Sequence, residues 1–258
     1  MFKLIKKVQN VILTFQFWLK FSLCGFFTCK KPMIELSFDT DLGSINLSGK
    51  LLKGDYDQGF QFLNIFKKNS DKYNDRTIEL LREAHSFSWL YHLASNDDNK
   101  SRAFTRTLFT DWHKNYLPFN KITIDLNTTS LRLISLVLNS KFLVKSLKAE
   151  EKDLFDGLLI KTSWFLYVNY KLSERGMARL RTLIAIYFGF RTLNIKSFPI
   201  NKIMCLISKE VNVLTKKGEL LKIRNPDIIL EAFTLISRVL KIVSEKDSKS
   251  KTFTFDLV

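Results

Sequence analysis

Three histidines are the residues whose type and spacing come closest to a catalytic or metal-binding set. His85 and His92 are seven positions apart, which is two turns of a helix, so they share one helical face, while His113 follows on the next segment. Two imidazoles on one face can contribute to a metal site, but nothing nearby completes one convincingly. Histidines in the core or on the surface are therefore the preferred interpretation, and the sequence indicates no cofactor.

The cysteines and the common catalytic motifs point to no familiar enzyme class. Cys24, Cys29 and Cys205 are odd in number, which indicates no disulfide framework, and the spacing of the first two does not make a zinc site. The sequence contains no glycine-rich phosphate loop, no HExxH, no paired CxxC and no GxSxG nucleophile elbow.

The charge of the chain predicts a polyanionic partner without choosing one. Lys and Arg number 41 against 25 Asp and Glu, a formal charge of +16 over 258 residues. Nucleic acid, an anionic membrane surface and an acidic polysaccharide all fit this charge, and so does a solvated, lysine-rich surface with no such partner. Arg175, Arg179 and Arg181 near Trp164 and Tyr167 could suit nucleic acid, but any electropositive helix bundle could carry such a set, and nucleic acid is the least favoured partner.

The amino end, residues 1–32, is apolar and basic. Lysines precede an apolar stretch from Val8 to Phe27, but Gln9, Gln16 and Lys20 interrupt it, and no clean cleavage site follows. A helix packed on the body or lying on a membrane surface is favoured, a spanning anchor comes second and a cleaved signal third. We therefore expect a cytoplasmic or membrane-associated protein rather than one released by cleavage.

The rest of the chain predicts a mostly helical domain over residues 33–247. Short alternating runs separated by turn residues indicate an extended, hairpin-like lead-in over 33–70. Apolar residues at helical spacing, with Pro and Asn at the breaks, then predict about seven antiparallel helices. Their expected bounds are 75–94, 99–116, 127–142, 150–171, 173–193, 200–215 and 226–244. Residues 248–258 read as a polar tail that enters a missing domain.

The order of three segments resembles the amino-terminal half of heparinase II/III-like proteins, in particular a bacterial subgroup. The segments are HSFSWL at 85–90, an RLI-type helix containing Arg132 that follows a helix with Trp112, and RNP at 224–226. The resemblance covers roughly residues 35–245. It implies a helical (α/α) toroid, here incomplete, which in the family precedes a β-sandwich domain.

The resemblance also implies a chemistry. Lyases of this family cleave uronic-acid-containing glycans by β-elimination, in which a side chain neutralises the uronate and a base removes its α-proton. On this basis Asn169 and Tyr170 are candidates for neutralisation and base. His85, Trp89, Arg132 and Arg224 are candidates for substrate binding, since a guanidinium pairs with a carboxylate through two hydrogen bonds. An exposed Asn beside a packing Tyr, a core Trp and arginines that cap helices are the alternative interpretations.

Two departures from the family pattern limit that expectation. The β-sandwich half is absent from the chain, and Gly218-Glu219-Leu220 stands where the family has a Gly-Gly-His turn. We therefore expect the helical half of a polysaccharide lyase that is inactive alone and works with a β-sandwich partner on a separate chain. The alternative is a non-catalytic helical scaffold or remnant that binds a polyanion or a membrane surface.

Overall fold

The computed structural model describes residues 19, 43–53, 55–56, 60–61, 75–116, 122–195, 200–216 and 226–247. This part of the chain is mostly α-helical, as predicted, and contains ten α-helices, one 3₁₀ turn and one small hairpin. The helices are α2 (Ile45–Leu52), α4 (Asp75–Ser86), α5 (Trp89–Asn96), α6 (Asn99–Tyr116), α7 (Leu126–Leu138), α8 (Ser140–Ser146), α9 (Ala149–Asn169), α10 (Met177–Thr192), α11 (Ile200–Lys216) and α13 (Pro226–Asp247), with the 3₁₀ turn at Tyr170–Leu172.

Two of the predicted helices are each divided by a residue with an irregular backbone. The helix expected over 75–94 is divided into α4 and α5 at Phe87, whose φ is 60°. The helix expected over 127–142 is divided into α7 and α8 at Asn139, whose side-chain amide donates to the carbonyl of Ser135 at 2.9 Å. Such a bond competes with the regular helical pattern, and so helical periodicity alone does not show the break.

The lead-in contains a helix that the alternating pattern concealed. Residues 45–52, predicted as extended, form α2, whose first turn is capped by Ser44 through a bond from the backbone N–H of Leu47 at 3.4 Å. Leu51 is buried where α2 packs on α5. A serine directly before the segment, in a position to cap a helix, is the sequence signal for this helix, and it outweighs the alternating pattern.

The expected hairpin is present but very short. β1 (Asp55–Tyr56) pairs antiparallel with β2 (Phe60–Gln61) in the register Asp55 to Gln61 and Tyr56 to Phe60. β1 lies among the turn residues at 54–59, so the first strand is closer to the carboxyl end than the run at 44–52 that was expected to be extended.

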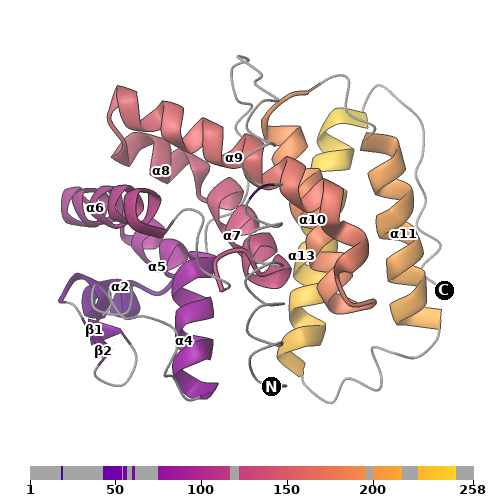
Figure 1. Ribbon diagram of the computed structural model, residues 1–258, viewed down its shortest axis with the longest axis horizontal. Helices are drawn as coiled ribbons and strands as arrows, with labels where there is room; N and C mark the ends of the chain where they lie inside the picture. The colour runs from indigo at the N-terminus through magenta and orange to yellow at the C-terminus, as the bar shows by residue number, and fades with distance from the viewer. Residues whose placement is uncertain are drawn as a thin grey trace, which may run out of the picture.

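α7 and α10 form the centre of the molecule. In Figure 1 they lie between α2, α4, α5 and α6 on one side and α11 on the other, while α13 crosses behind α10. α10 is almost wholly buried because it packs against α7, α9, α11 and α13. Gly189 permits this closeness, since a Cβ there would collide with the side chain of Ser163 on α9.

Several sequence predictions concern residues that the structure does not describe. These are the helix expected in residues 1–32, apart from Leu19, and the tail at 248–258, together with Cys24, Cys29 and Arg224. In the described part of the chain, no helix has both the length and the apolarity needed to cross a membrane.

Candidate functional site

The HSFSWL segment, residues 85–90, spans the turn between α4 and α5. The last carbonyls of a helix have no partner within the helix, and here side chains supply the missing donors. Ser86 and Ser88 donate to the carbonyl of Glu83 at 2.7 and 3.2 Å, and the indole of Trp89 donates to the carbonyl of Ala84 at 3.1 Å. Both serines and Trp89 thus have a structural role in ending α4.

Arg132 completes this arrangement from α7. Its guanidinium donates to the carbonyl of His85 at 3.2 Å and to that of Thr123 at 2.8 Å, and it stacks 4.8 Å from the ring centroid of Trp112. Arg132 is 2% exposed, and burial lowers its pKa to about 9, which leaves it protonated at neutral pH. One side chain therefore ties α7 to the end of α4, to the turn before α7 and to α6.

His85 is held in the same cluster as a neutral base. The indole N–H of Trp112 donates to its Nδ1 at 3.0 Å, so that nitrogen carries no proton. Burial first, and the charge of Arg132 second, lower the pKa of His85 to about 3. The Phe87 ring fills the space beside it, 4.9 Å from the Trp112 ring and 5.1 Å from the Trp89 ring. We call His85, Phe87, Trp89, Trp112 and Arg132 the buried cluster.

The buried cluster corrects the predicted substrate-binding set. His85 and Trp89 are each 1% exposed and Arg132 is 2% exposed, so a polysaccharide cannot reach their side chains. The structure does bring the three residues together, but in the core. A core position was the alternative interpretation for Trp89, and a core or surface position was the preferred one for the histidines. Arg132 braces a helix end, the alternative that the sequence left open for it.

The candidate catalytic pair does not form a site either. Asn169 is 1% exposed and donates its side-chain amide to the carbonyl of Phe165 at 2.8 Å, one turn earlier on α9. Tyr170 is half-buried in the 3₁₀ turn and packs against the core. Because Asn169 is buried, the expectation of an exposed Asn beside a packing Tyr is wrong for the Asn and confirmed for the Tyr.

The remaining polar candidates are dispersed. His92 lies on α5 and accepts the backbone N–H of Ser44 at its Nδ1, 3.1 Å away, while His113 lies on α6. Among the described residues, no three His, Cys, Asp or Glu side chains are grouped as metal ligands. Arg179 donates to the carbonyls of Lys171 and Ser173 at 3.0 and 2.6 Å and so braces the turn before α10.

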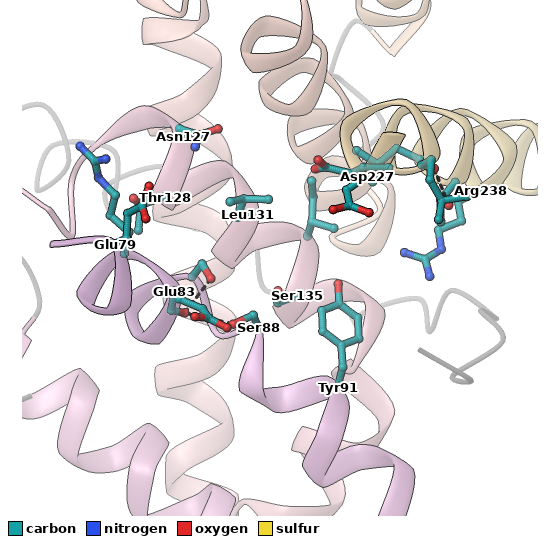
Figure 2. Close-up of a pocket in the computed structure, with 17 residues that line it drawn as sticks. Glu79, Glu83, Ser88, Tyr91, Asn127, Thr128, Leu131, Ser135, Asp227 and Arg238 are labelled. Carbon is teal, nitrogen blue, oxygen red and sulfur yellow. Dashed lines mark hydrogen bonds between the residues drawn. The ribbon is translucent and has the colours of Figure 1, made fainter. Parts of the chain in front are cut away.

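A pocket of about 680 Å³ lies where α4, α5, α7 and α13 meet (Figure 2). This volume is in the range typical of small-molecule sites. α4 contributes Glu79, Arg82 and Glu83 to its wall, and Figure 2 shows the side chain of Tyr91 rising from α5 toward the space beside α13. We call this cavity the four-helix pocket.

The other two walls combine polar and aliphatic side chains. α7 contributes Asn127, Thr128, Leu131 and Ser135, and α13 contributes Asp227, Glu231 and Arg238 with two leucines. Figure 2 places Asp227 and Arg238 across the pocket from Glu79 and Glu83. Aliphatic walls with a few oriented polar groups are the usual composition of a ligand site.

The charges of the four-helix pocket are opposite in sign to that of the chain. Four carboxylates and two guanidiniums line it, in a chain of charge +16. Glu231 is held by Arg181 behind the wall, which donates from Nε at 2.6 Å and again from its Nη2. The other three carboxylates belong to Glu79, Glu83 and Asp227, and the two guanidiniums to Arg82 and Arg238. The charged groups that line the pocket are therefore negative in sum.

No family model, no curated protein and no solved structure matches this chain.

The four-helix pocket has hydrogen-bond donors and charged groups, but no histidine is among the described residues that line it. Burial raises the pKa of Tyr91 above its ordinary value of 10.0, although Ser135 and Arg238 at its hydroxyl oppose the change. Tyr91 is thus a protonated donor at neutral pH. His85, which precedes Ser86 of the pocket wall, is buried and accepts a hydrogen bond from the indole of Trp112.

Sequence reasoning missed the residues that line this pocket. Glu79, Arg82 and Tyr91 flank the HSFSWL segment, and Ser135 follows Arg132 by three positions. The pocket is therefore lined from the neighbourhood of the segments singled out in the sequence, but by other side chains than the candidates named there. The available signal was helical phase. Residues three or four positions apart share a face, so Glu79, Glu83 and Ser86 lie together. His85 is two positions from Glu83 and one from Ser86, and so it falls on another face.

Proposed function

We propose that the chain is the helical half of a heparinase II/III-like polysaccharide lyase, an incomplete (α/α) toroid that binds an acidic glycan in the four-helix pocket. One observation carries the proposal. The HSFSWL segment, the RLI segment and the residue that follows RNP lie far apart in the sequence, yet all three line one pocket, through Ser86 and Ser88, through Leu131 and Ile134, and through Asp227. Segments that share a site are the ones expected to stay similar in a family.

The polar groups suit binding better than cleavage. Arg82 and Arg238 can each pair with a uronate carboxylate, and Tyr91 can donate a hydrogen bond to a sugar oxygen. β-Elimination needs a base near neutrality, whereas Tyr91 remains protonated and His85 is enclosed. The helical half is therefore inactive alone, and a β-sandwich partner on a separate chain supplies the base.

The test is calorimetric titration of galacturonate oligosaccharides into the full chain. Arg238→Gln should weaken binding by about tenfold, as expected for loss of a charged hydrogen-bond donor. Arg102→Gln is the matched control, since Arg102 pairs with Asp97 at 2.8 Å outside the pocket. Equal affinities of the two variants would contradict the proposal.

A second experiment tests the catalytic half of the proposal. Uronate elimination leaves an unsaturated product that absorbs in the ultraviolet. The chain alone should give none, and the chain mixed with a β-sandwich protein recovered with it from its native extract should give the product. Absence of product from the mixture would leave only the binding function.

The second candidate is a non-catalytic scaffold that binds a polyanion or a membrane surface. The observation that favours it is the charge of +16, with exposed lysines such as Lys141, Lys171 and Lys209 on three different elements. Binding of this kind depends on total charge rather than on one pocket. It would be equally weakened by Arg238→Gln and Arg102→Gln and abolished by moderate salt.

A further inference from the structure

The turn between α9 and α10 is fixed from inside the protein. The guanidinium of Arg179 donates to the carbonyls of Lys171 and Ser173 at 3.0 and 2.6 Å. The backbone N–H of Gly176 donates to Oε1 of Glu210, a buried residue of α11, at 2.6 Å. Covering the turn with another surface therefore leaves none of these three backbone groups without a partner.

The same turn exposes aliphatic and basic side chains. Val168 and Leu172, four positions apart, are 55% and 62% exposed. Lys171 and Arg175 are exposed as well. We call these four residues the turn patch. Because residues 168–179 carry three cations and one carboxylate, the turn patch combines exposed apolar surface with local positive charge.

We infer that the turn patch docks on the surface of an anionic lipid membrane. At such a surface, aliphatic side chains enter the boundary between headgroups and acyl chains, while Lys and Arg side chains meet the negative headgroups. The inference goes beyond the proposed function, because none of the four residues lines the four-helix pocket.

The composition of the turn patch favours lipid over other partners of a basic surface. A soluble acidic polysaccharide or a nucleic acid backbone offers charge but no apolar phase, and so it leaves Val168 and Leu172 in water. A folded protein partner needs about 800 Å² of surface on each side, which four side chains do not supply. A lipid boundary needs no complementary shape, and a small patch gives weak, reversible binding to it.

Aromatic side chains on α9 adjoin the turn patch. Trp164 and Tyr167 are half-buried, precede Val168 by four positions and by one, and have ring centroids 5.8 Å apart. Both rings pack on the buried ring of Phe190, with centroids 4.9 and 6.2 Å away. Tryptophan and tyrosine are enriched at membrane–water interfaces, where an apolar ring and a polar tip are both accommodated. The residues beside the turn patch thus suit the same surroundings.

The experiment is co-sedimentation of the full chain with two kinds of vesicle. One is phosphatidylcholine with about one-third phosphatidylserine and the other is phosphatidylcholine alone, both at about 0.15 M salt. We expect binding to the anionic vesicles only. Leu172→Ser should lower the partition coefficient about tenfold, as for one inserted aliphatic side chain. The matched control is Leu154→Ser, a leucine 41% exposed in the amino-terminal half of α9, with a change below about twofold.

A second pair of variants tests the charge of the turn patch. Lys171→Gln should lower the partition coefficient about fivefold, which is the contribution of one basic side chain near an anionic surface. Lys141→Gln removes the same charge from an exposed position on α8 and should change the coefficient by less than about twofold. All four substituted side chains are exposed, so the urea midpoints of the variants should match that of the parent chain.

Several results would overturn the inference. These are no binding to anionic vesicles, equal binding to both kinds of vesicle, and equal losses in a variant and its matched control. A loss in Lys171→Gln with none in Leu172→Ser would also overturn it, because that is the result for a soluble polyanion.

Calorimetry with galacturonate oligosaccharides keeps the proposed function separate. Leu172→Ser should bind them as the parent chain does, so a failure of vesicle binding leaves the proposed function intact. Vesicle binding without galacturonate binding would overturn the proposed function and leave the inference intact.

Discussion

The two faces of α7 differ in what they do with polar side chains. On one face, Arg132 enters the buried cluster, where backbone carbonyls and an aromatic ring surround it. On the other, Leu131 and Ser135 line the four-helix pocket with charged groups from α4 and α13. Neighbouring positions of one helix thus lie in the core on one side and line a pocket on the other, and the residue type alone does not tell which.

The largest expected effect comes from removing the centre of the buried cluster. Arg132→Ala leaves the carbonyls of His85 and Thr123 without a donor and opens a cavity, and should lower the free energy of unfolding by about 3 kcal/mol. Urea denaturation followed by circular dichroism measures it. The control is Arg191→Ala, a half-buried arginine whose guanidinium bonds the hydroxyl of Tyr187 and lies over its ring, with a loss of less than about 1 kcal/mol. Similar losses in both variants would show that Arg132 in the buried cluster contributes no more to the free energy of unfolding than Arg191 does.

The next effect is the dependence of stability on pH. The pKa of His85 is lowered from 6.5 to about 3 on folding, so the folded state binds fewer protons, and stability is lost as pH falls below about 6.5. Between pH 7 and pH 5 the loss should be about 2 kcal/mol, measured as a shift in the urea midpoint. Burial also lowers the pKa of His92 and His113, which adds in the same direction.

His85→Asn isolates the contribution of His85 from those of the other two histidines. This variant should be less stable at pH 7, but its stability should change less between pH 7 and pH 5. An unchanged slope would contradict a neutral, enclosed His85.

A smaller effect is expected for the donor that holds His85. Trp112→Phe keeps an aromatic ring beside Phe87 but leaves the Nδ1 of His85 without its donor, and should cost about 1–2 kcal/mol. A rise in the pKa of His85, followed by NMR titration of its ring protons, should accompany the loss. An unaltered titration would show that the Trp112 bond does not set the protonation of His85.

The smallest effect on stability is expected in the four-helix pocket. Arg82 is exposed on α4, so Arg82→Gln should change the free energy of unfolding by less than about 0.5 kcal/mol. The same change should weaken galacturonate binding in calorimetry, because a guanidinium is lost from the wall. A strong loss of stability with unchanged binding would show that Arg82 supports the fold and does not bind the glycan.

The spacing of apolar residues along the sequence predicted the helices better than it predicted the role of single side chains. The periodicity from residue 75 onward predicted the helices closely, because burial of one face is what a 3.6-residue period reports. It did not show the break at Phe87, since a left-handed φ at a bulky residue is stabilised by tertiary packing on Trp89 and Trp112. For the same reason the sequence placed His85 and Arg132 in a site, when their contacts with Trp112 hold them in the core.

The most direct test of the central claim is backbone hydrogen exchange of the full chain with and without a galacturonate oligosaccharide. We predict that the ligand slows exchange in residues 79–91, 127–135 and 227–238, the segments that form the four-helix pocket, and leaves α9 and α11 unchanged. Protection spread over the lysine-bearing helices, or no protection at all, would contradict a glycan site in the pocket.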